Sequence, residues 1–115
     1  MLAMNEAPST PAERFTAVVA AFLANPDVTP PSGQGFGSSG LRVKGKIFAM
    51  LSSKGEYVVK LPPRRVDALV EAGHGERYDP GHGRRMKEWL QVEPTSAIDW
   101  LELAREALSF VAPKP

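Results

Sequence analysis

The spacing of apolar residues changes at Leu41, and this change constrains the fold more than any other feature of the sequence. From Phe15 to Leu23, apolar side chains recur at intervals of three and four residues, which is the period of an amphipathic helix. From Leu41 onward they form short runs and alternations, separated by the turn pairs Lys44-Gly45 and Lys54-Gly55. Such a pattern predicts a sheet of short, consecutively connected strands beside at least one helix.

Capping signals locate the first two helices. The stretch from Thr10 to Glu13 matches a capping box with proline at the first helical position, so we expect a helix to begin there. Asn25-Pro26 is expected to stop it. Pro62-Pro63 predicts the start of a second helix, and Gly73 suits the left-handed position after its end.

The last helix follows a similar signal. Ser96 and Asp99 resemble a capping box, and Asp99 also suits the positive end of a helix. Its apolar face is expected to run from Ile98 through Leu101 to Val111.

The clearest strand pattern lies before the second helix. Tyr57, Val59 and Leu61 alternate with Val58 and Lys60, which predicts a strand with one buried face. We also expect a short strand over residues 76–79 and another over residues 86–93.

The predicted order of elements is α-β-β-β-α-β-β-α. Short turns between the strands favour antiparallel pairing, and helices packed on one face of such a sheet give an α+β fold. We expect a single domain over residues 10–112, with a disordered tail at 1–9 and a short tail at 113–115. Residues 26–40 form a long Pro/Gly/Ser connection, which is unusual in a small domain and often functional.

Composition excludes several classes of function. The 115 residues include no cysteine, so disulfides, thiolate catalysis and Cys-type zinc sites are ruled out. No apolar run approaches the roughly 18 residues of a membrane span, and the start lacks a signal-peptide pattern. We therefore expect a cytoplasmic protein without membrane contact.

Two motifs are candidate ligand sites. Gly35-Phe36-Gly37-Ser38-Ser39-Gly40 matches G-x-G-x-x-G, but a Pro-Pro loop precedes it and a strand follows, the wrong context for a dinucleotide site. We therefore predict no cofactor, and Gly35, Phe36 and Gly37 remain a candidate ligand loop with Phe36 as its lid. His74 and His82 lack the ligand spacing of a zinc site, so we expect no metal. Loop positions fit them better, one of them closing a turn by a hydrogen bond.

Positive charge is concentrated in the middle of the chain. Residues 41–87 hold eleven Lys/Arg and five Asp/Glu, although the net charge of the whole chain is +1. If the sheet brings strand ends together, cations from two segments form one patch beside a histidine and a tryptophan. The candidate nucleic-acid-binding residues are Lys60, Arg64, Arg65, Arg84, Arg85, Lys87, His82 and Trp89. Ordinary solvated surface explains the same cations, so this alternative stays open. No nucleophile, base or carboxylate pair indicates an enzyme.

Several stretches resemble the YjbR/MmcQ and TfoX N-terminal-domain group of small bacterial proteins. The resemblance covers about residues 35–112. Its carriers are GKIFAM at residues 45–50, VKLP at 59–62 with Arg65, Val66 and Leu69, then residues 83–89, Trp100-Leu101 and Ala104-Arg105. It implies an α-β(3)-α-β(2)-α arrangement, shared with secretion-chaperone-like domains, in which helices cover an antiparallel sheet.

The resemblance implies binding and supplies no catalytic motif. YjbR-like proteins are often labelled DNA-binding. TfoX N-terminal domains precede a second domain in competence regulators, and this chain stops after the first, so a competence role is not expected. Our leading hypothesis is a module that binds DNA or a regulatory complex through the basic patch. The alternatives are a chaperone-like or homodimeric protein-interaction module, and a small-ligand binder under the 26–40 loop.

Overall fold

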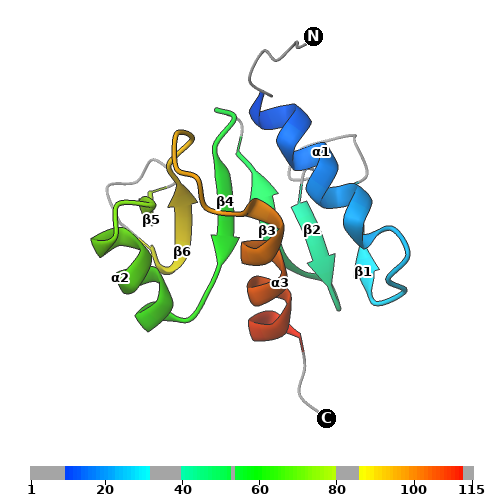
Figure 1. The fold of residues 1–115 in the computed structure, drawn as a ribbon. Coiled ribbons are helices and arrows are strands. Elements are labelled where there is room, and N and C mark those ends of the chain that lie inside the picture. Colours follow the sequence, from blue (N-terminus) through cyan, green and yellow to red (C-terminus); the bar gives the residue numbers. More distant parts are fainter. Residues whose placement is uncertain (1–9, 32–39, 53, 80–85, 113–115) are drawn as a thin grey trace, which may run out of the picture.

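The computed structural model describes residues 10–31, 40–52, 54–79 and 86–112, which form three helices and a six-stranded sheet (Figure 1). In chain order the elements are α1 (Pro11–Phe22), β1 (Val28–Thr29), β2 (Gly40–Val43), β3 (Lys46–Leu51), β4 (Tyr57–Lys60), α2 (Pro63–Glu71), β5 (Gly75–Tyr78), β6 (Met86–Val92) and α3 (Trp100–Val111). The strands lie in the order β1-β2-β3-β4-β6-β5, and all neighbouring pairs are antiparallel. The predicted α+β fold is confirmed, with one strand more than the sequence indicated.

The additional strand, β1, lies within the connection predicted at residues 26–40. Val28 and Thr29 pair with Val43 and Arg42 of β2, and the Val28 side chain is buried. Two residues are too few to show an alternating pattern, so no sequence signal distinguishes this strand from a loop.

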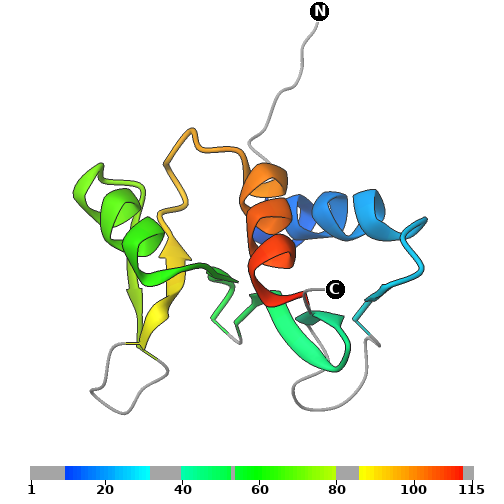
Figure 2. The same cartoon turned by 90° about the horizontal axis from the view of Figure 1, so that it is seen from below.

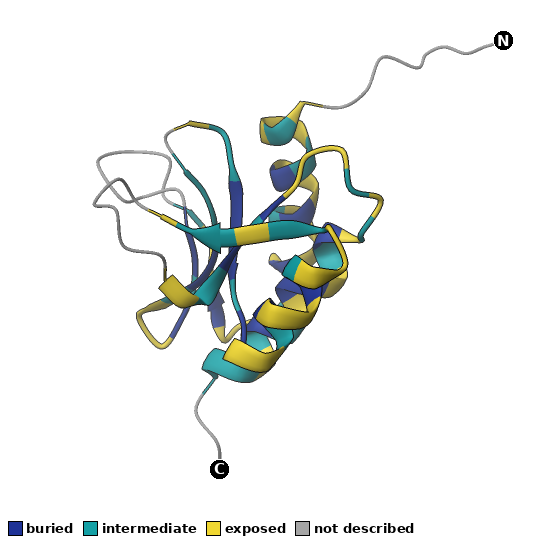
Figure 3. Cartoon of the chain, turned by 90° about the vertical axis from the view of Figure 1, so that its left-hand side faces the viewer, coloured by how far each residue is buried: buried dark blue, intermediate teal, exposed yellow. Residues whose placement is uncertain are grey.

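All three helices pack on the same face of the sheet, as the view in Figure 2 shows. Buried side chains from all three join buried strand residues in one cluster. Within the described residues, the opposite face carries no helix (Figure 3). In the described part of the chain, the sheet therefore has one face in the core and one face on which no helix packs.

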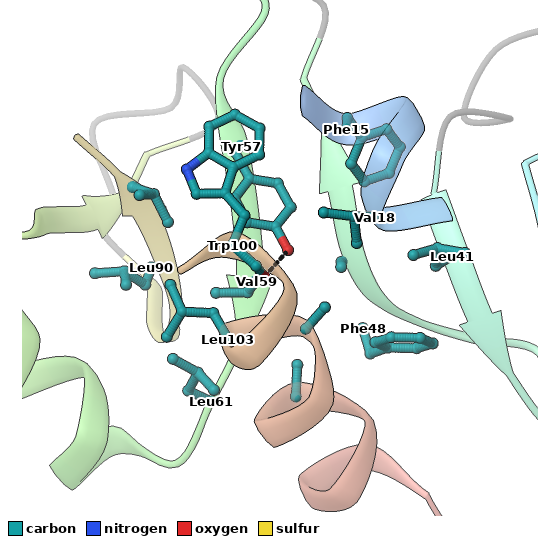
Figure 4. Close-up of a cluster of buried hydrophobic side chains, with 14 of the residues drawn as sticks. Phe15, Val18, Leu41, Phe48, Tyr57, Val59, Leu61, Leu90, Trp100 and Leu103 are labelled. Carbon is teal, nitrogen blue, oxygen red and sulfur yellow. Dashed lines mark hydrogen bonds between the residues drawn. The ribbon is translucent and has the colours of Figure 1, made fainter. Parts of the chain in front are cut away.

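An aromatic stack joins α3 to the centre of the sheet (Figure 4). The rings of Tyr57 and Trp100 are stacked, with centroids 4.1 Å apart, and the Tyr57 hydroxyl donates a 2.9 Å hydrogen bond to the Trp100 carbonyl. The guanidinium carbon of Arg14 lies 3.9 Å from the Trp100 ring centroid. Two groups this close to one ring cannot share a face, so Trp100 lies between them. Burial, and secondarily the charge of Asp99, raises the pKa of Tyr57 far above its usual value.

Two of the predicted helix ends are confirmed. The Thr10 hydroxyl accepts from the Glu13 amide, and the Glu13 carboxylate accepts from the Thr10 amide, as a capping box requires. At the end of α2, Gly73 has φ +84, and the His74 amide donates to the Leu69 carbonyl at 3.0 Å. This is a Schellman motif, in which the left-handed residue is usually glycine.

The start of α3 differs from the prediction. Asp99 is the N-cap, because its carboxylate accepts from the amides of Leu101 and Glu102 at 2.9 and 3.2 Å. Ser96 does not cap the helix, and its hydroxyl accepts from the Ile98 amide within the preceding turn. Ile98 therefore lies outside the helix, although it packs against the core.

Two apolar residues also differ from the predicted pattern. Leu23, expected on the buried face of the first helix, is 66% exposed because it follows the last helical residue. Val58, expected on a polar strand face with Lys60, is completely buried. Its cross-strand neighbours in the sheet are Met50 and Gln91.

The predicted tails at 1–9 and 113–115 lie outside the described residues. In the part of the chain that the structure describes, none of the helices has the length and apolar character needed to span a membrane.

Candidate binding face of the sheet

One face of the sheet carries no helix in the described structure, and we call it the helix-free face. A row of paired residues crosses five strands of this face: Gly40, Met50, Val58, Gln91 and Glu76. Residues opposite one another on paired strands point to the same side of a sheet. Val58 is buried but is not part of the cluster that the helices cover, which assigns the row to the helix-free face.

Lys60 and Trp89 form the next pair along this face. They are opposite each other on β4 and β6, and the Lys60 Nζ lies 5.5 Å from the Trp89 ring centroid, within the range of a cation–π contact. Their chain neighbours Val59, Leu61 and Leu90 all belong to the core cluster, so Lys60 and Trp89 point away from the helices. Both side chains are half-buried.

The charged side chains near Trp89 are accessible. Lys60 Nζ is 3.8 Å from Glu88 Oε1, and the two side chains are 33% and 42% exposed. Such an exposed ion pair contributes little to stability, so an incoming anion can displace the carboxylate. Lys87 is exposed on the same strand, two residues before Trp89, where the register between β6 and β5 shifts. This end of the face thus presents an aromatic ring beside the Lys60 ammonium group, with a second exposed cation on the same strand.

The other end of the face is flatter and more apolar. Arg42 and Ile47 are opposite each other on β2 and β3, and the Ile47 side chain lies over Gly40. A Cβ at Gly40 would lie 2.9 Å from Ile47 Cγ2, so the missing side chain makes room for the isoleucine. Met50 is half-buried beside them.

The predicted cations do not all lie on this face. Arg65, in the first turn of α2, binds Glu106 of α3 through two contacts, Nε–Oε1 at 2.8 Å and Nη2–Oε2 at 3.1 Å. The hydrogen bond to Glu106 raises the pKa of Arg65. Arg64 is exposed on the same helix. The structure therefore brings Lys60 and Trp89 together and places Arg65 in the helical layer, where it links two helices.

Folding also cancels part of the charge separation along the sequence. Lys60 and Arg65, from the basic middle segment, pair with Glu88 and Glu106 from residues 88–115, which hold five Asp/Glu and two Lys/Arg. Among the described residues, Arg77 of β5 is also paired, with Asp67 of α2. The surface is consequently less basic than the middle of the sequence indicates.

Several predicted site residues lie outside the described residues. They are Arg84, Arg85 and His82 of the basic segment, and Gly35, Phe36 and Gly37 of the glycine loop.

His74 has the structural position expected of it. Its Nδ1 lies 2.7 Å from the Ser96 hydroxyl, and its carbonyl accepts from the Glu93 amide at 2.8 Å. These contacts join the end of α2 to the turn before α3. No group of three or more His, Cys, Asp or Glu side chains that could hold a metal is found within the described ranges.

A hollow of about 250 Å³ lies beside the beginning of the connection at residues 26–40. Its lining combines polar, charged and apolar residues: Asn25, Asp27, Val43, Lys44, Leu108 and Ala112. One acidic and one basic side chain indicate no particular ligand, so this hollow gives the small-ligand hypothesis no specific support.

Sequence reasoning did not identify the residues that surround Lys60 and Trp89. Met50, Gln91 and Glu76 carry no individual signal, since each is an ordinary strand residue. They become part of one surface only through the order β3-β4-β6-β5, which places β6 between β4 and β5. Strand alternation can show which residues share a side of one strand, but it does not show which strands are neighbours.

Comparisons with known proteins give one match. The YjbR family model matches residues 23–107, which include every strand and most of α3. Searches of curated proteins and of solved structures give no match.

Proposed function

We propose that this chain, which belongs to the YjbR family, is a nucleic-acid-binding domain that uses the helix-free face of its sheet. The observation that carries the proposal is the pair of Lys60 and Trp89, which places an ammonium group beside an aromatic ring on that face. Nucleic acids use both kinds of partner, because phosphates attract cations and bases stack on aromatic rings. The proposed activity is binding, without a chemical step.

A protein-interaction module has less support. Such a module needs a contiguous exposed apolar patch. In the described part of the chain, the exposed large apolar side chains are Leu23 and Met86, which belong to different elements. The sheet edges are also poor partners, because β1 has two residues and β5 carries Glu76 and Arg77, and short charged edges discourage strand pairing.

The test compares two variants of equal charge. Lys60→Gln/Lys87→Gln removes the cation beside Trp89 and the exposed cation two residues before Trp89 on β6. Arg64→Gln/Arg105→Gln removes two cations from the helical layer, on α2 and α3. Affinity for a labelled oligonucleotide is measured by fluorescence anisotropy at several salt concentrations.

We expect the first variant to bind more weakly and to reduce the salt slope by about 0.7 for each phosphate that the protein no longer neutralises. The second should retain the affinity and slope of the natural sequence. Equal weakening in both variants would mean that only overall charge matters, and the proposed face would be wrong.

A further inference from the structure

We infer that the helix-free face takes single-stranded rather than duplex nucleic acid, with one unpaired base stacked on Trp89 in place of the Lys60 ammonium group. The inference rests on the proposed function and specifies its ligand. It starts from the position of Trp89 within β6, opposite Lys60 of β4.

The shape of the face argues against a duplex. Proteins usually read the major groove of DNA with a helix or a two-stranded ribbon that projects into it. In the described structure the three helices all lie on the opposite face (Figure 2). Trp89 and Lys60 are residues of the strands β6 and β4 themselves. A surface made of strand side chains fits bases that have left their own stack, as in sheets that bind single strands through aromatic residues.

The partial burial of Trp89 and its contact with Lys60 indicate a site where such a base can stack. The Trp89 side chain is half-buried, and the Lys60 ammonium lies 5.5 Å from its ring centroid. A base and an ammonium group cannot occupy the same side of the ring. A base that stacks on the side where Lys60 lies therefore displaces the ammonium group, and a phosphate of the same nucleotide gives it a new partner.

Moving the Lys60 ammonium group from the Trp89 ring to a phosphate breaks only weak contacts of the free protein. Lys60 has two weak contacts, the ring at 5.5 Å and Glu88 at 3.8 Å, and a third of its side chain is exposed. Neither contact orders the ammonium strongly. Lys87, exposed on the same strand as Trp89, is placed to contact a neighbouring phosphate. The two lysines and the ring would then contact adjacent nucleotides.

The face also limits what else can bind there. Glu76 lies at the end of the row that contains Gln91, so the side of the face toward β5 is acidic. We expect the strand of nucleic acid to avoid this side and to run past Lys60 and Lys87. Gln91, between Val58 and Glu76 in register, can donate and accept hydrogen bonds at a base edge.

The experiment uses the full chain and three ligands of equal length: a single-stranded oligonucleotide, the matching duplex, and an abasic deoxyribose-phosphate oligomer. Binding is followed by the indole Nε1–H resonances of the two tryptophans. These are assigned with Trp89→Phe, and Trp100, which is 5% exposed, serves as the internal reference. Trp89→Leu and Lys60→Met are the test variants, and thermal unfolding checks that each remains folded.

We expect the single strand to bind at least about tenfold more tightly than the abasic oligomer, with a shift at Trp89 and none at Trp100. Trp89→Leu should remove this difference without changing the salt slope. Lys60→Met should keep the difference and lower the slope by about 0.7.

Other outcomes separate the two proposals. Equal binding of the base-bearing and abasic strands, with Trp89 unshifted, would overturn the stacking inference and leave the phosphate contacts of the proposed function in place. Binding of the duplex as tight as that of the single strand would overturn it as well. Failure of all three ligands to bind would reject the proposed function itself.

Discussion

Contacts of Trp100 connect the beginning of α3 to the sheet and to α1. The Tyr57 hydroxyl is buried and donates to the carbonyl of Trp100, the first residue of α3, so one hydrogen bond holds that helix on the sheet. Arg14 of α1 covers the other side of the same tryptophan. A change at Tyr57 therefore affects the contact between α3 and the sheet directly.

Tyr57 makes the stability of the fold sensitive to alkaline pH. Its pKa is raised in the folded state from an ordinary value of 10.0, by burial first and by Asp99 second. Above pH 10 the unfolded chain loses this proton while the folded chain keeps it, so the free energy of unfolding falls by at most about 1.4 kcal/mol per pH unit. Below that pH the contribution is fully present. Urea unfolding between neutral and alkaline pH measures it.

The matched variant is Tyr57→Phe, which removes the titrating group. We expect it to be less stable by about 1 kcal/mol at neutral pH, because it cannot form the hydrogen bond to Trp100, and to flatten the alkaline fall. A smaller fall should persist, since the pKa of Tyr78 is also raised, by burial and then by Glu56 and Asp79. An unchanged alkaline profile in Tyr57→Phe would show that another group controls it.

The contact between His74 and Ser96 provides a second test at this scale. It joins residues 22 positions apart at 2.7 Å and fixes the turn before α3. We expect His74→Ala and Ser96→Ala each to lower the free energy of unfolding, with a coupling of about 1 kcal/mol in a double-mutant cycle. Strictly additive effects would mean that the two side chains do not depend on each other.

At the scale of the elements, α1 depends on its capping box. Thr10→Ala removes the acceptor for the Glu13 amide and should cost about 1 kcal/mol of stability. Thr16→Ala is the control in the same helix, because the Thr16 hydroxyl only donates back to the Ala12 carbonyl. That change should remain within about 0.5 kcal/mol of zero. Equal destabilisation in both variants, measured by chemical denaturation, would argue against a specific role of the cap.

The first turn of α2 distinguishes a structural arginine from a surface arginine. Arg65 makes a bidentate pair with Glu106, whereas Arg64 is exposed, and both add positive charge at the positive end of the helix. We expect Arg65→Gln to lower stability by about 0.5–1 kcal/mol and Arg64→Gln to leave it unchanged or slightly higher, as measured by urea unfolding.

Nucleic-acid affinity should also distinguish Arg64 and Arg65 from the residues of the helix-free face. Neither Arg64→Gln nor Arg65→Gln should weaken binding of nucleic acid as much as Lys60→Gln does. If Arg65→Gln abolished nucleic-acid binding without lowering the free energy of unfolding, Arg65 would be a binding residue. That result would contradict its assignment as a structural link between α2 and α3.

At the scale of the whole molecule, the sequence predicts the layers better than the surface. Periodicity, turn pairs and capping residues predict all three helices and the strands that correspond to β2, β3, β4 and β6, because these signals are local. The short strand predicted over residues 76–79, which corresponds to β5, shows no repeating pattern. β1 was missed because a strand of two residues is too short to show an alternating pattern. The burial of Val58 was missed because alternation with Val59 assigns it to the same side of β4 as Lys60, the side predicted to be polar.

The candidate site was predictable only in part, for a related reason. Lys60 and Trp89 were both selected from the sequence, but their pairing follows from the neighbouring positions of β4 and β6 across about thirty residues of intervening chain. The pairing of Arg65 with Glu106 spans 41 positions and cancels a charge that the sequence count treated as available. Long-range pairing decides which cations remain on the surface, and local patterns contain no information about it.

The most direct test of the proposed face is a backbone NMR titration with a short single-stranded oligonucleotide at low salt, with an acidic peptide of equal charge as the control. We expect the largest shifts on β4 and β6 around Lys60, Trp89 and Gln91. These shifts should disappear as salt is raised, and the peptide should not reproduce them. Shifts centred on the helices, or equal shifts with both anions, would contradict the assignment of the helix-free face as a nucleic-acid site.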